Sequence, residues 1–526
     1  MKKASLKIVL VSAGAILFNI LFWQEKMALN TLLFTAFILS ALFALYPTSL
    51  KQPTMKWLLA AHIVTLAAVV IQNTLLSKLA FSVSLLLVIV FAQYLHRSVW
   101  YAGASAITNF IMMIHSFLEN IQLMREGKFK LKGVGKMFRF LVIPLILVFV
   151  FFLLYNFANA AFQDLMNDVG IALQIFFSKL FTWFSWQRFG FLLLGLFVTG
   201  GLLLRSNISY FSELDVKKHN DLWRQKNDLK EWKKSYWFEL LSLLMGRFAN
   251  GVMALRNENI TGIISLMLLN VLLFCINYLD IVYVWFGFTY KNNINPSEYV
   301  HEGTGLLIFS IVLAMALLLF FFRGNLNFYK KNKWLKYGAY AWLFQNAVLV
   351  VSVLFRDYYY IAHMGLAYKR IGVLVFLLLV LVGLITVFIK IHQRKTTYYL
   401  LRVNAWFAII VLVVASCIHW DETIAKYNLA RKNTVLLDVK FLLTLSDKTL
   451  PVLEKNMDVL DKAGVKIPGS EGEYLYRSVL TPREVFEIRK KVFLQQQQTY
   501  SWLSWNAADS YVKESFSKTT LSYSLK

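Results

Sequence analysis

The sequence predicts an all-α protein, a polytopic bundle of transmembrane helices followed by a small helical domain. Hydrophobic residues make up 58% of the chain, and the mean hydropathy of +0.55 is far above that of a water-soluble protein. Apolar residues gather in eleven windows, each near the length of about 20 residues that a helix needs to cross a bilayer. No window alternates apolar and polar residues as barrel strands do. The composition excludes a soluble enzyme.

Each predicted span is an uninterrupted apolar window. In chain order the spans are Leu6–Trp23, Met27–Leu45, Trp57–Leu76, Leu79–Tyr94, Phe140–Phe162, Phe189–Leu204, Ile260–Phe286, Gly303–Phe322, Tyr337–Phe355, Ile371–Ile389 and Leu400–Trp420. The first window follows Lys2 and Lys3, and no cleavage site of small residues follows it. We therefore interpret it as an uncleaved signal anchor and not as a secretory signal.

Lysine and arginine residues predict the orientation. With the N-terminus in the cytoplasm, 31 of those before residue 421 fall in cytoplasmic segments and eight fall on the other side. Cytoplasmic loops of membrane proteins carry this excess of positive charge. An odd number of spans then places the C-terminal tail outside the cytoplasm, whereas one span more or fewer would reverse its position.

The same partition explains the net charge of +26. Basic loops next to a bilayer act as orientation signals and contact anionic headgroups. No nucleic-acid-binding motif accompanies them, so membrane lipids are the predicted partners and nucleic acid is not. Cys275 and Cys417 both lie in apolar windows, and they offer neither a disulfide framework nor a cysteine metal site.

Composition divides the chain into a transmembrane domain, residues 1–420, and a helical extracytoplasmic tail, residues 421–526. Amphipathic cytoplasmic helices are predicted near 98–124 and 222–248, and an aromatic outer segment at Ile171–Trp186 suits the headgroup level. The first helix has an apolar face and a polar face at helical spacing. The apolar face contains Ile107, Phe110, Ile111, Ile114, Leu118 and Ile121, and the polar face contains Asn109, His115 and Glu119.

Two helices are predicted in the tail. One runs from Lys448 to Ala463 and stops at Gly464. The other begins at a capping box formed by Thr481 and Glu484, with a proline at the first helical position. Its predicted apolar stripe consists of Val485, Ile488, Val492 and Phe493.

Ionisable residues in a membrane are functional candidates, because each costs roughly 2.5–3.5 kcal/mol near a helix centre. Asp280 lies near the outer end of the seventh span. The predicted topology gathers further chemically able side chains at the outer ends of four helices. They are His301, Glu302, Arg356, Tyr359, Tyr360, His363, Tyr368, Arg370, His419, Asp421 and Glu422.

Arginines in such a cluster can bind an anionic group bidentately, and histidine or glutamate can transfer protons. His301, Glu302 and His363 are the catalytic candidates. The candidates for binding a ligand are Arg356, Tyr359, Tyr360, Tyr368, Arg370, Asp280 and Asp421. The alternative interpretation is a salt-bridged cap that ties the helix ends together. The imidazoles and carboxylates have no fixed metal-ligand spacing, so neither a metal nor another cofactor is predicted.

Polar residues within the spans have two interpretations, hydrogen bonds between helices or a functional site. Those in the third, fifth and seventh spans could line a transport path. The polar residues are His62, Gln72 and Asn73 in the third span, Asn156, Asn159 and Gln163 at the fifth, Asn270 and Asn277 in the seventh, and Gln345, Asn346 and Asn404 in the ninth and eleventh.

The stretch from Pro296 to Asn428 resembles a known family, the uncharacterised polytopic bacterial membrane proteins with the domain of unknown function numbered 4173, which is related to the one numbered 4153. The residues that carry the resemblance are His301, Glu302, Gly303, Arg323, Gly324, Asn325, Asn327, Gln345, Asn346, Tyr368, Lys369, Arg370, Ile371, Gly372, Arg402, Asn404, Trp406, Trp420, Asp421, Ile424, Ala425, Tyr427 and Asn428. The tail stretch Leu437–Leu453 is similar to the segment that comes next in the chain of such proteins. The resemblance implies a multi-pass protein of the bacterial inner membrane, without an established activity.

Three functional hypotheses remain open. The first is a non-enzymatic scaffold, regulator or ligand-binding component whose outer cluster and tail contact a lipid, a glycan or another protein. The second is an enzyme that transfers a glycan or lipid-linked group, with Arg356 and Arg370 holding a phosphate and His301 or His363 as the base. The third is a transporter, although no inverted repeat or broken helix pair is evident.

Overall fold

The structure is a computed structural model, and most of the chain is described. The described residues are 2–124, 144–145, 147–156, 158–180, 185–223, 254–286, 296–322, 325–462, 467–468 and 479–524. The described chain forms two compact units. Unit 1 contains Met1–His96, Tyr101–Leu214 and Gln498–Ala507, and unit 2 contains Arg97–Trp100, Asp215–Gln497 and Ala508–Lys526.

Helices long and apolar enough to cross a membrane confirm the predicted all-α, multi-pass architecture. In the described part there are eight of them, or up to nine if a bent pair, Leu147–Asn156 with Ala161–Ile171, is one span. The eight lie in α1 (Lys2–Phe22), α3 (Pro53–Ile71), α4 (Leu75–Gln93), α9 (Trp186–Leu203), α13 (Ala254–Asp280) with η3 (Ile281–Trp285), α15 (Lys333–Met364), α16 (Tyr368–Gln393) and α17 (Thr397–Ser416). Two shorter apolar helices are α2 (Leu29–Leu45) and Gly305–Phe321 of α14 (Pro296–Phe321). Each predicted window overlaps one of these helices or the bent pair.

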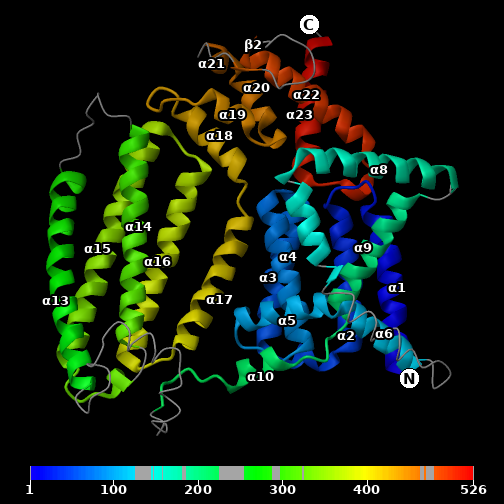
Figure 1. Cartoon of the computed structure of the whole chain (residues 1–526). Coiled ribbons are helices and arrows are strands. Elements are labelled where there is room, and N and C mark those ends of the chain that lie inside the picture. The colour runs from blue at the N-terminus through cyan, green and yellow to red at the C-terminus, as the bar shows by residue number, and fades with distance from the viewer. Residues whose placement is uncertain are drawn as a thin grey trace. The chain divides into compact units, whose positions relative to one another are not determined.

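Unit 1 is built on α1, which packs against α2, α6 and α9, and on the hairpin of α3 and α4 (Figure 1). Small residues allow α1 and α9 to approach closely, as is common between membrane helices. A Cβ at Gly195 would lie 3.0 Å from the Ala15 carbonyl oxygen. Thr199 adds a polar link, because its hydroxyl lies 3.2 Å from the Val11 carbonyl oxygen.

The predicted helix near residues 98–124 is two helices, α5 (Val99–Ile111) and α6 (Met113–Met124). On α5 the buried face is the polar one, whereas His115 of the predicted polar face, on α6, is exposed. Asn109 is buried and accepts hydrogen bonds from the Tyr94 hydroxyl, at 2.7 Å, and from the Ser206 N–H, at 3.0 Å. Ile107 and Ile111 are exposed. A polar face turned to protein and an apolar face turned away fits a helix surrounded by lipid.

Other predicted segments are only partly described. Within Ile171–Trp186, the end of α8 (Ala160–Leu180) and the start of α9 are described, but residues 181–184 lie outside the described residues. Most of the predicted helix near 222–248 lies outside them as well. The short helix α10 (Tyr210–Lys217) precedes that region.

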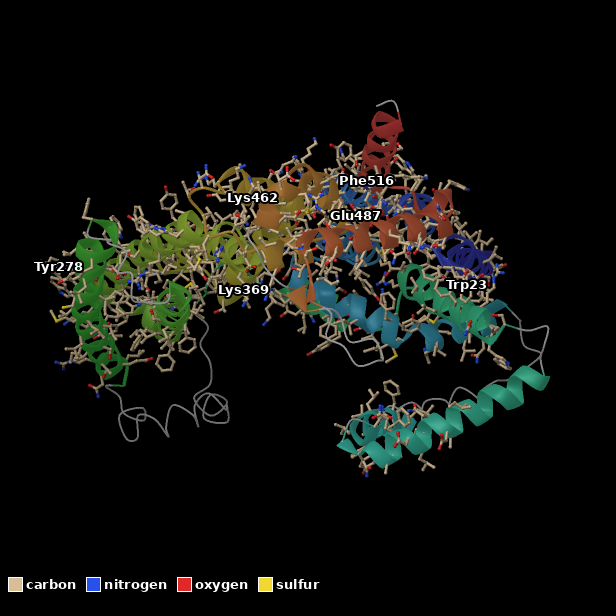
Figure 2. All side chains as sticks on the ribbon, turned by 90° about the horizontal axis from the view of Figure 1, so that it is seen from above. Trp23, Tyr278, Lys369, Lys462, Glu487 and Phe516 are labelled. Carbon is tan, nitrogen blue, oxygen red and sulfur yellow. The ribbon has the colours of Figure 1, made fainter. Side chains whose placement is uncertain are left out.

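In unit 2 the long helices α13 to α17 lie side by side, with α15 packed against α13, α14 and α16 (Figure 1). Leu266, Ile311, Trp342 and Val380, from four of these helices, are among the residues of one buried apolar core. Tyr278 lies exposed on the outer edge of α13 (Figure 2). The short η4 (Asn325–Phe328) connects α14 to α15.

The tail folds as short helices on a second apolar core. They are α18 (Trp420–Ala430), α19 (Val439–Thr444), η5 (Asp447–Thr449), α20 (Leu450–Lys455), α21 (Met457–Lys462), α22 (Pro482–Thr499) and α23 (Ala507–Ser524). The short η6 (Trp502–Ser504) belongs to unit 1. Ile424, Leu453, Phe486 and Phe516 belong to this core, and so does Ile371 of the membrane helix α16. The tail helices of unit 2 therefore pack on the start of α16. Strands β1 (Ile467–Pro468) and β2 (Val479–Leu480) pair antiparallel, with Ile467 opposite Leu480.

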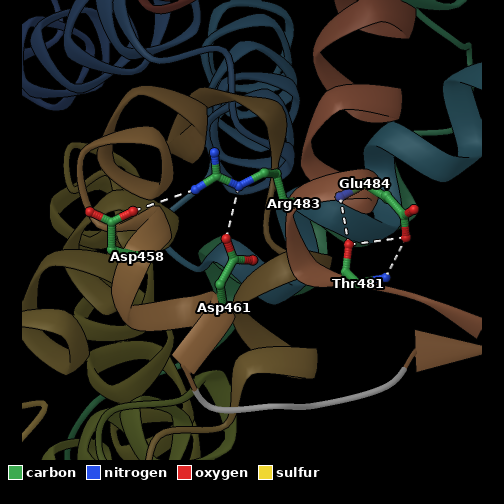
Figure 3. Close-up of polar contacts among 5 residues, drawn as sticks. All are labelled: Asp458, Asp461, Thr481, Arg483 and Glu484. Atoms are coloured by element: carbon green, nitrogen blue, oxygen red, sulfur yellow. Dashed lines mark hydrogen bonds and ion pairs between the residues drawn. The ribbon is translucent and has the colours of Figure 1, made fainter.

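The capping box of α22 is confirmed. The Thr481 N–H donates to Glu484 Oε2 at 2.7 Å, and the Glu484 N–H donates to the Thr481 hydroxyl at 3.3 Å (Figure 3). Beside it, Arg483 pairs with Asp461 at 2.8 Å and with Asp458 at 3.4 Å. These bonds fix the start of α22 against α21.

Two details of the tail prediction are wrong. The continuous helix Lys448–Ala463 is interrupted between α20 and α21, where Asn456 ends the first. The stripe on α22 is right only in part. Phe493 is buried and Val485 packs on the tail core, but Ile488 and Val492 are exposed, and the buried Phe486 was not predicted. Phe486 and Phe493 are seven residues apart, which also places them on one face of a helix.

Candidate functional site

The predicted outer residues lie where α13, α15, α16 and α18 end or begin, all within unit 2. Asp280 is the last residue of α13, and its carboxylate pairs with Arg356 of α15 at 2.5 Å. Both side chains are largely buried, with exposed fractions of 8% for Asp280 and 15% for Arg356. Asp280 Oδ2 and Arg356 Nε are also buried, and neither has a hydrogen-bond partner among the described residues.

A ladder of amides holds α13 against α15 and so sets this ion pair. Gln345 Nε2 donates to Asn270 Oδ1 at 2.8 Å, and Asn277 Nδ2 donates to the Gln345 carbonyl at 3.0 Å. Farther along, the Trp285 indole N–H donates to the Ser352 hydroxyl at 3.0 Å. The bonds made by the amides are the hydrogen bonds between helices that were predicted for polar residues within the spans.

Arg370, in the first turn of α16, reaches back to the end of α15. Its Nη1 donates to the carbonyl oxygens of Met364, at 3.0 Å, and Gly365. Its guanidinium carbon lies 4.1 Å from the centre of the Tyr360 ring, which is a cation–π contact. Asp357, a buried carboxylate on α15, lies within the electrostatic influence of Arg370. The guanidinium group thus caps α15 in the way that cations stabilise helix C-termini.

The turn between α15 and α16 is clasped by the tail. Asn428 of α18 accepts a hydrogen bond from the Leu366 N–H at 2.6 Å and donates to the Leu366 carbonyl at 2.9 Å. The Leu436 N–H donates to the His363 carbonyl at 2.9 Å. Gly365 has a φ of +79°, and a Cβ there would collide with the Asn428 amide. Only glycine fits this close approach without strain.

The remaining candidates lie around this joint with separate partners. The exposed His363 ring has its Nδ1 3.0 Å from the Tyr359 carbonyl oxygen, and Tyr359 stacks on Phe355. Tyr368 meets the ring of Phe441 edge to face. The structure therefore brings Asp280 to Arg356 and Arg370 to Tyr360, and it gives His363 and Tyr368 other neighbours.

His419 and Asp421 lie at the start of α18. His419 Nδ1 accepts a hydrogen bond from the Glu422 N–H at 3.2 Å and so caps the helix. Burial, together with the charge of Lys448, lowers the pKa of His419 below its usual value, so the neutral, accepting ring is favoured. Asp421 is buried, and its Oδ1 has no hydrogen-bond partner in the described part of the chain. Glu422 pairs with Lys426 one turn later, at 2.6 Å.

His301 and Glu302 fall within α14, but their side chains lie outside the described residues. The described residues contain no group of three or more His, Cys, Asp or Glu that could hold a metal ion. Cys275 and Cys417 are both exposed, and neither forms a disulfide within the described residues.

Sequence reasoning missed several buried ionisable groups among the described residues. Asp357 is one, and Lys390 near the end of α16 is another. Lys390 is 2% exposed, and its ammonium group donates to the Phe322 carbonyl just past α14, at 2.8 Å. Asp215 is fully buried as well.

The Asp215 carboxylate joins three segments of unit 2. It accepts hydrogen bonds from the Arg97 N–H at 2.7 Å, the Ser98 N–H at 3.0 Å and the Tyr398 hydroxyl at 2.5 Å. A charge inside or next to an apolar window was the available signal for Lys390 and Asp357, because such groups are expensive in a membrane. Asp215 lies outside every predicted window and gave no such signal.

Comparison with known proteins places this arrangement in a family. A family model described as a domain of unknown function, DUF4153, matches residues 12–456. The match covers the N-terminal half as well as the stretch that carried the predicted resemblance, whereas the relation to the family numbered 4173 stays a resemblance. No curated protein and no solved structure matches the chain. The chain is therefore a multi-pass membrane protein that belongs to the DUF4153 family.

Proposed function

We propose that the chain is a non-enzymatic scaffold of the bacterial cytoplasmic membrane, which holds its helical tail rigidly on the extracytoplasmic side for contact with a lipid, a glycan or another protein. In this proposal the cluster at α13, α15, α16 and α18 is the joint between the membrane helices of unit 2 and the tail. Its charged groups serve the joint and do not bind a substrate.

The observation that carries the proposal is that both arginines of the cluster are engaged within the chain. Arg356 is paired with Asp280, and Arg370 is held by two carbonyl oxygens and the Tyr360 ring. A guanidinium group that binds a phosphate does so with a fork of free N–H donors. One amino group of each guanidinium is already bonded within the chain, and this supports the cap over the ligand-binding and group-transfer alternatives.

The clasp on the α15–α16 turn supports the same function. Asn428 uses both atoms of its amide on Leu366, and Ile371 is part of the tail core. Polar bonds and apolar burial then act together, so the tail helices do not swing freely on a linker. A fixed tail is what a platform for a partner needs, because less conformational entropy is lost on binding.

Charge asymmetry in unit 2 supports the proposed orientation. Lys330, Lys331 and Lys333 lie where α14 leads into α15, and Arg394 and Lys395 lie where α16 leads into α17. Both connections are at the end of these antiparallel helices opposite the α15–α16 turn. By the positive-inside rule that basic end faces the cytoplasm and the tail faces outward.

The amide ladder weakens the transport alternative. Asn270 and Asn277 of the seventh span were candidates for a polar path, and their amides bond between α13 and α15. An amide that joins two helices in this way stabilises the pair by about 1 kcal/mol and does not present itself to a passing solute.

The function is tested by separating structural loss from functional loss. We expect Arg356→Ala and Arg370→Ala to lower membrane abundance and to make the tail sensitive to added protease, because each change frees a buried group. His363→Ala is the matched control, since that side chain is exposed on the same helix, and abundance should not change. Normal abundance and protease resistance with a lost cellular phenotype in either arginine variant would overturn the scaffold and favour a ligand site.

The orientation has its own test. A reporter that is active only outside the cytoplasm, fused after Asn428, should be active, and a fluorescent reporter that folds only in the cytoplasm should be dark there. The opposite result would place the joint and the tail in the cytoplasm.

A further inference from the structure

In unit 1, a segment from near the C-terminus of the described chain is hydrogen-bonded to the α1–α2 connection. This segment, residues 500–506, is called the strap, and it contains η6. Glu25, in the connection, accepts hydrogen bonds from the Ser501 N–H at 3.1 Å and from the Ser504 hydroxyl. The Lys26 N–H donates to the Ser504 hydroxyl at 3.0 Å. Hydrogen bonds from backbone and side-chain groups thus hold the strap against the α1–α2 connection.

Two more contacts complete the docking. The Leu29 N–H, at the start of α2, donates to the Trp505 carbonyl at 3.2 Å. The Lys26 ammonium group lies 4.7 Å from the centre of the Tyr500 ring. Ser504 and Asn506 are buried in this contact. Polar groups of the strap therefore have hydrogen-bond partners in the α1–α2 connection.

In contrast to these buried groups, the tryptophan residues of the strap are exposed. Trp502 is 66% exposed and Trp505 is 48% exposed. Exposing two tryptophans leaves a large apolar area in contact with the surroundings, although each ring also has a polar N–H. Such amphipathic rings gather at the headgroup level of a bilayer, where one end is apolar and the other is wet.

The position of the strap on unit 1 indicates the level at which it lies relative to the membrane. The span in α1 ends at Phe22, α2 begins at Leu29, and the strap lies on the residues between. A connection that directly follows a membrane span lies at the membrane boundary, whichever leaflet that is. Trp23 lies at this end of α1 (Figure 2), and it packs against Phe191 of α9.

We propose that the strap is an interfacial anchor that binds the phospholipid headgroup layer through Trp502 and Trp505. Glu25 and Lys26 hold the strap at the membrane boundary, and the two rings enter the layer. The partner is thus a lipid surface, and the binding site is built from residues that lie far apart in the sequence.

The test measures what surrounds each ring position. In the full chain with Cys275→Ser and Cys417→Ser, a nitroxide is attached at Trp502→Cys or at Trp505→Cys, and the protein is reconstituted into phosphatidylethanolamine–phosphatidylglycerol vesicles. We expect both positions to be more accessible to molecular oxygen, which is apolar, than to a neutral nickel chelate, which is polar. Ile488→Cys on α22 is the matched control, since Ile488 is apolar and 51% exposed, and it should show the reverse preference.

If the cysteine variants fail to fold, a conservative variant provides a second test. With brominated phospholipids as the quencher, Trp502→Phe with Trp505→Phe should remove a fraction of the lipid-quenchable tryptophan fluorescence. An unchanged quenchable fraction would overturn the proposal. So would nitroxides that prefer the nickel chelate, which would place the strap in water, or that neither reagent reaches, which would place a protein surface over it.

Discussion

The two ends of the α15–α16 helix pair each hold a largely buried cation, and the two are compensated differently. Towards the α15–α16 turn, Arg356 is paired with the Asp280 carboxylate. At the opposite end, Lys390 is 2% exposed, and its described partner is the Phe322 carbonyl. Buried charge is thus tolerated either by an opposite charge or by the negative end of a neighbouring helix.

This contrast indicates which losses matter most. Removing one member of an ion pair leaves the other charge buried and alone, whereas removing a cation from a helix end leaves only a carbonyl group without its donor. The first state costs more free energy than the second. Removal of single side chains at the two ends tests this ranking.

The largest effect is expected at the ion pair. Arg356→Met should lower the free energy of unfolding by about 3–5 kcal/mol, because Asp280 is left buried without its partner. The double variant Asp280→Asn, Arg356→Met should recover most of the loss. Unfolding of the purified protein in mixed micelles, followed by circular dichroism, measures both. Equal stability of the single and double variants would contradict the pairing.

A smaller loss is expected at the other end. Lys390→Met should cost no more than about 2 kcal/mol, since the Phe322 carbonyl loses a donor but no opposite charge is stranded. The same unfolding measurement applies, and Lys390→Arg serves as a control that keeps the charge. A loss as large as that of Arg356→Met would mean that Lys390 has an anionic partner and would refute the ranking of the two ends.

His419 provides a pH-dependent contribution at the tail end. Because its pKa is lower in the folded protein than the unfolded value of about 6.5, its stabilisation is complete above that value and is lost as the pH falls through the folded pKa. Protonation also removes the lone pair that caps α18, which is worth about 1 kcal/mol. His419→Asn keeps a cap that does not titrate. We expect the Tm of the native chain to fall relative to this variant between pH 8 and pH 5, and parallel curves would contradict the role.

The smallest effect is expected at an exposed site. Hydrogen bonds from Thr481 lower the pKa of Glu484, so its contribution is present above the unfolded pKa of about 4.3 and is lost as the pH falls below it. The Tm difference between the native chain and Glu484→Ala should therefore shrink between pH 6 and pH 3. A difference independent of pH would show that the capping box does not depend on the charge.

Much of the fold followed from apolar windows and local signals. The windows located the membrane helices, because length and hydropathy alone decide whether a helix can span a bilayer. The capping box at Thr481 and Glu484 was equally local, since it depends on three residues of spacing.

Predictions that depended on which face packs against protein were less successful. Val485 and Phe493 of the predicted stripe on α22 contact the tail core, but Ile488 and Val492 are exposed, and the buried Phe486 was missed. For α5 the periodicity was correct and the buried face was the opposite one, because lipid and protein are both apolar neighbours of a membrane helix. Periodicity separates two faces but does not say which of them meets the protein.

The candidate site shows the same limit. Asp280 and Arg356 were both identified, and only the structure pairs them. Asp357 was overlooked because it follows Arg356 at the edge of a window, and Lys390 because it was counted as a loop charge. The described hydrogen-bond partners of Lys390 and Arg370 are backbone carbonyl oxygens and not charged side chains. A pattern of residue types therefore does not indicate these contacts.

The shared core of α16 and the tail imposes an order on biogenesis. Ile371 is synthesised and inserted early, while Phe516, which closes the same core, emerges only with α23. Until then Phe486 and its neighbours have no complete covering, and the growing chain exposes an apolar surface after its membrane helices are in place. A chain truncated before α23 would therefore lack Phe516 and leave this core incomplete.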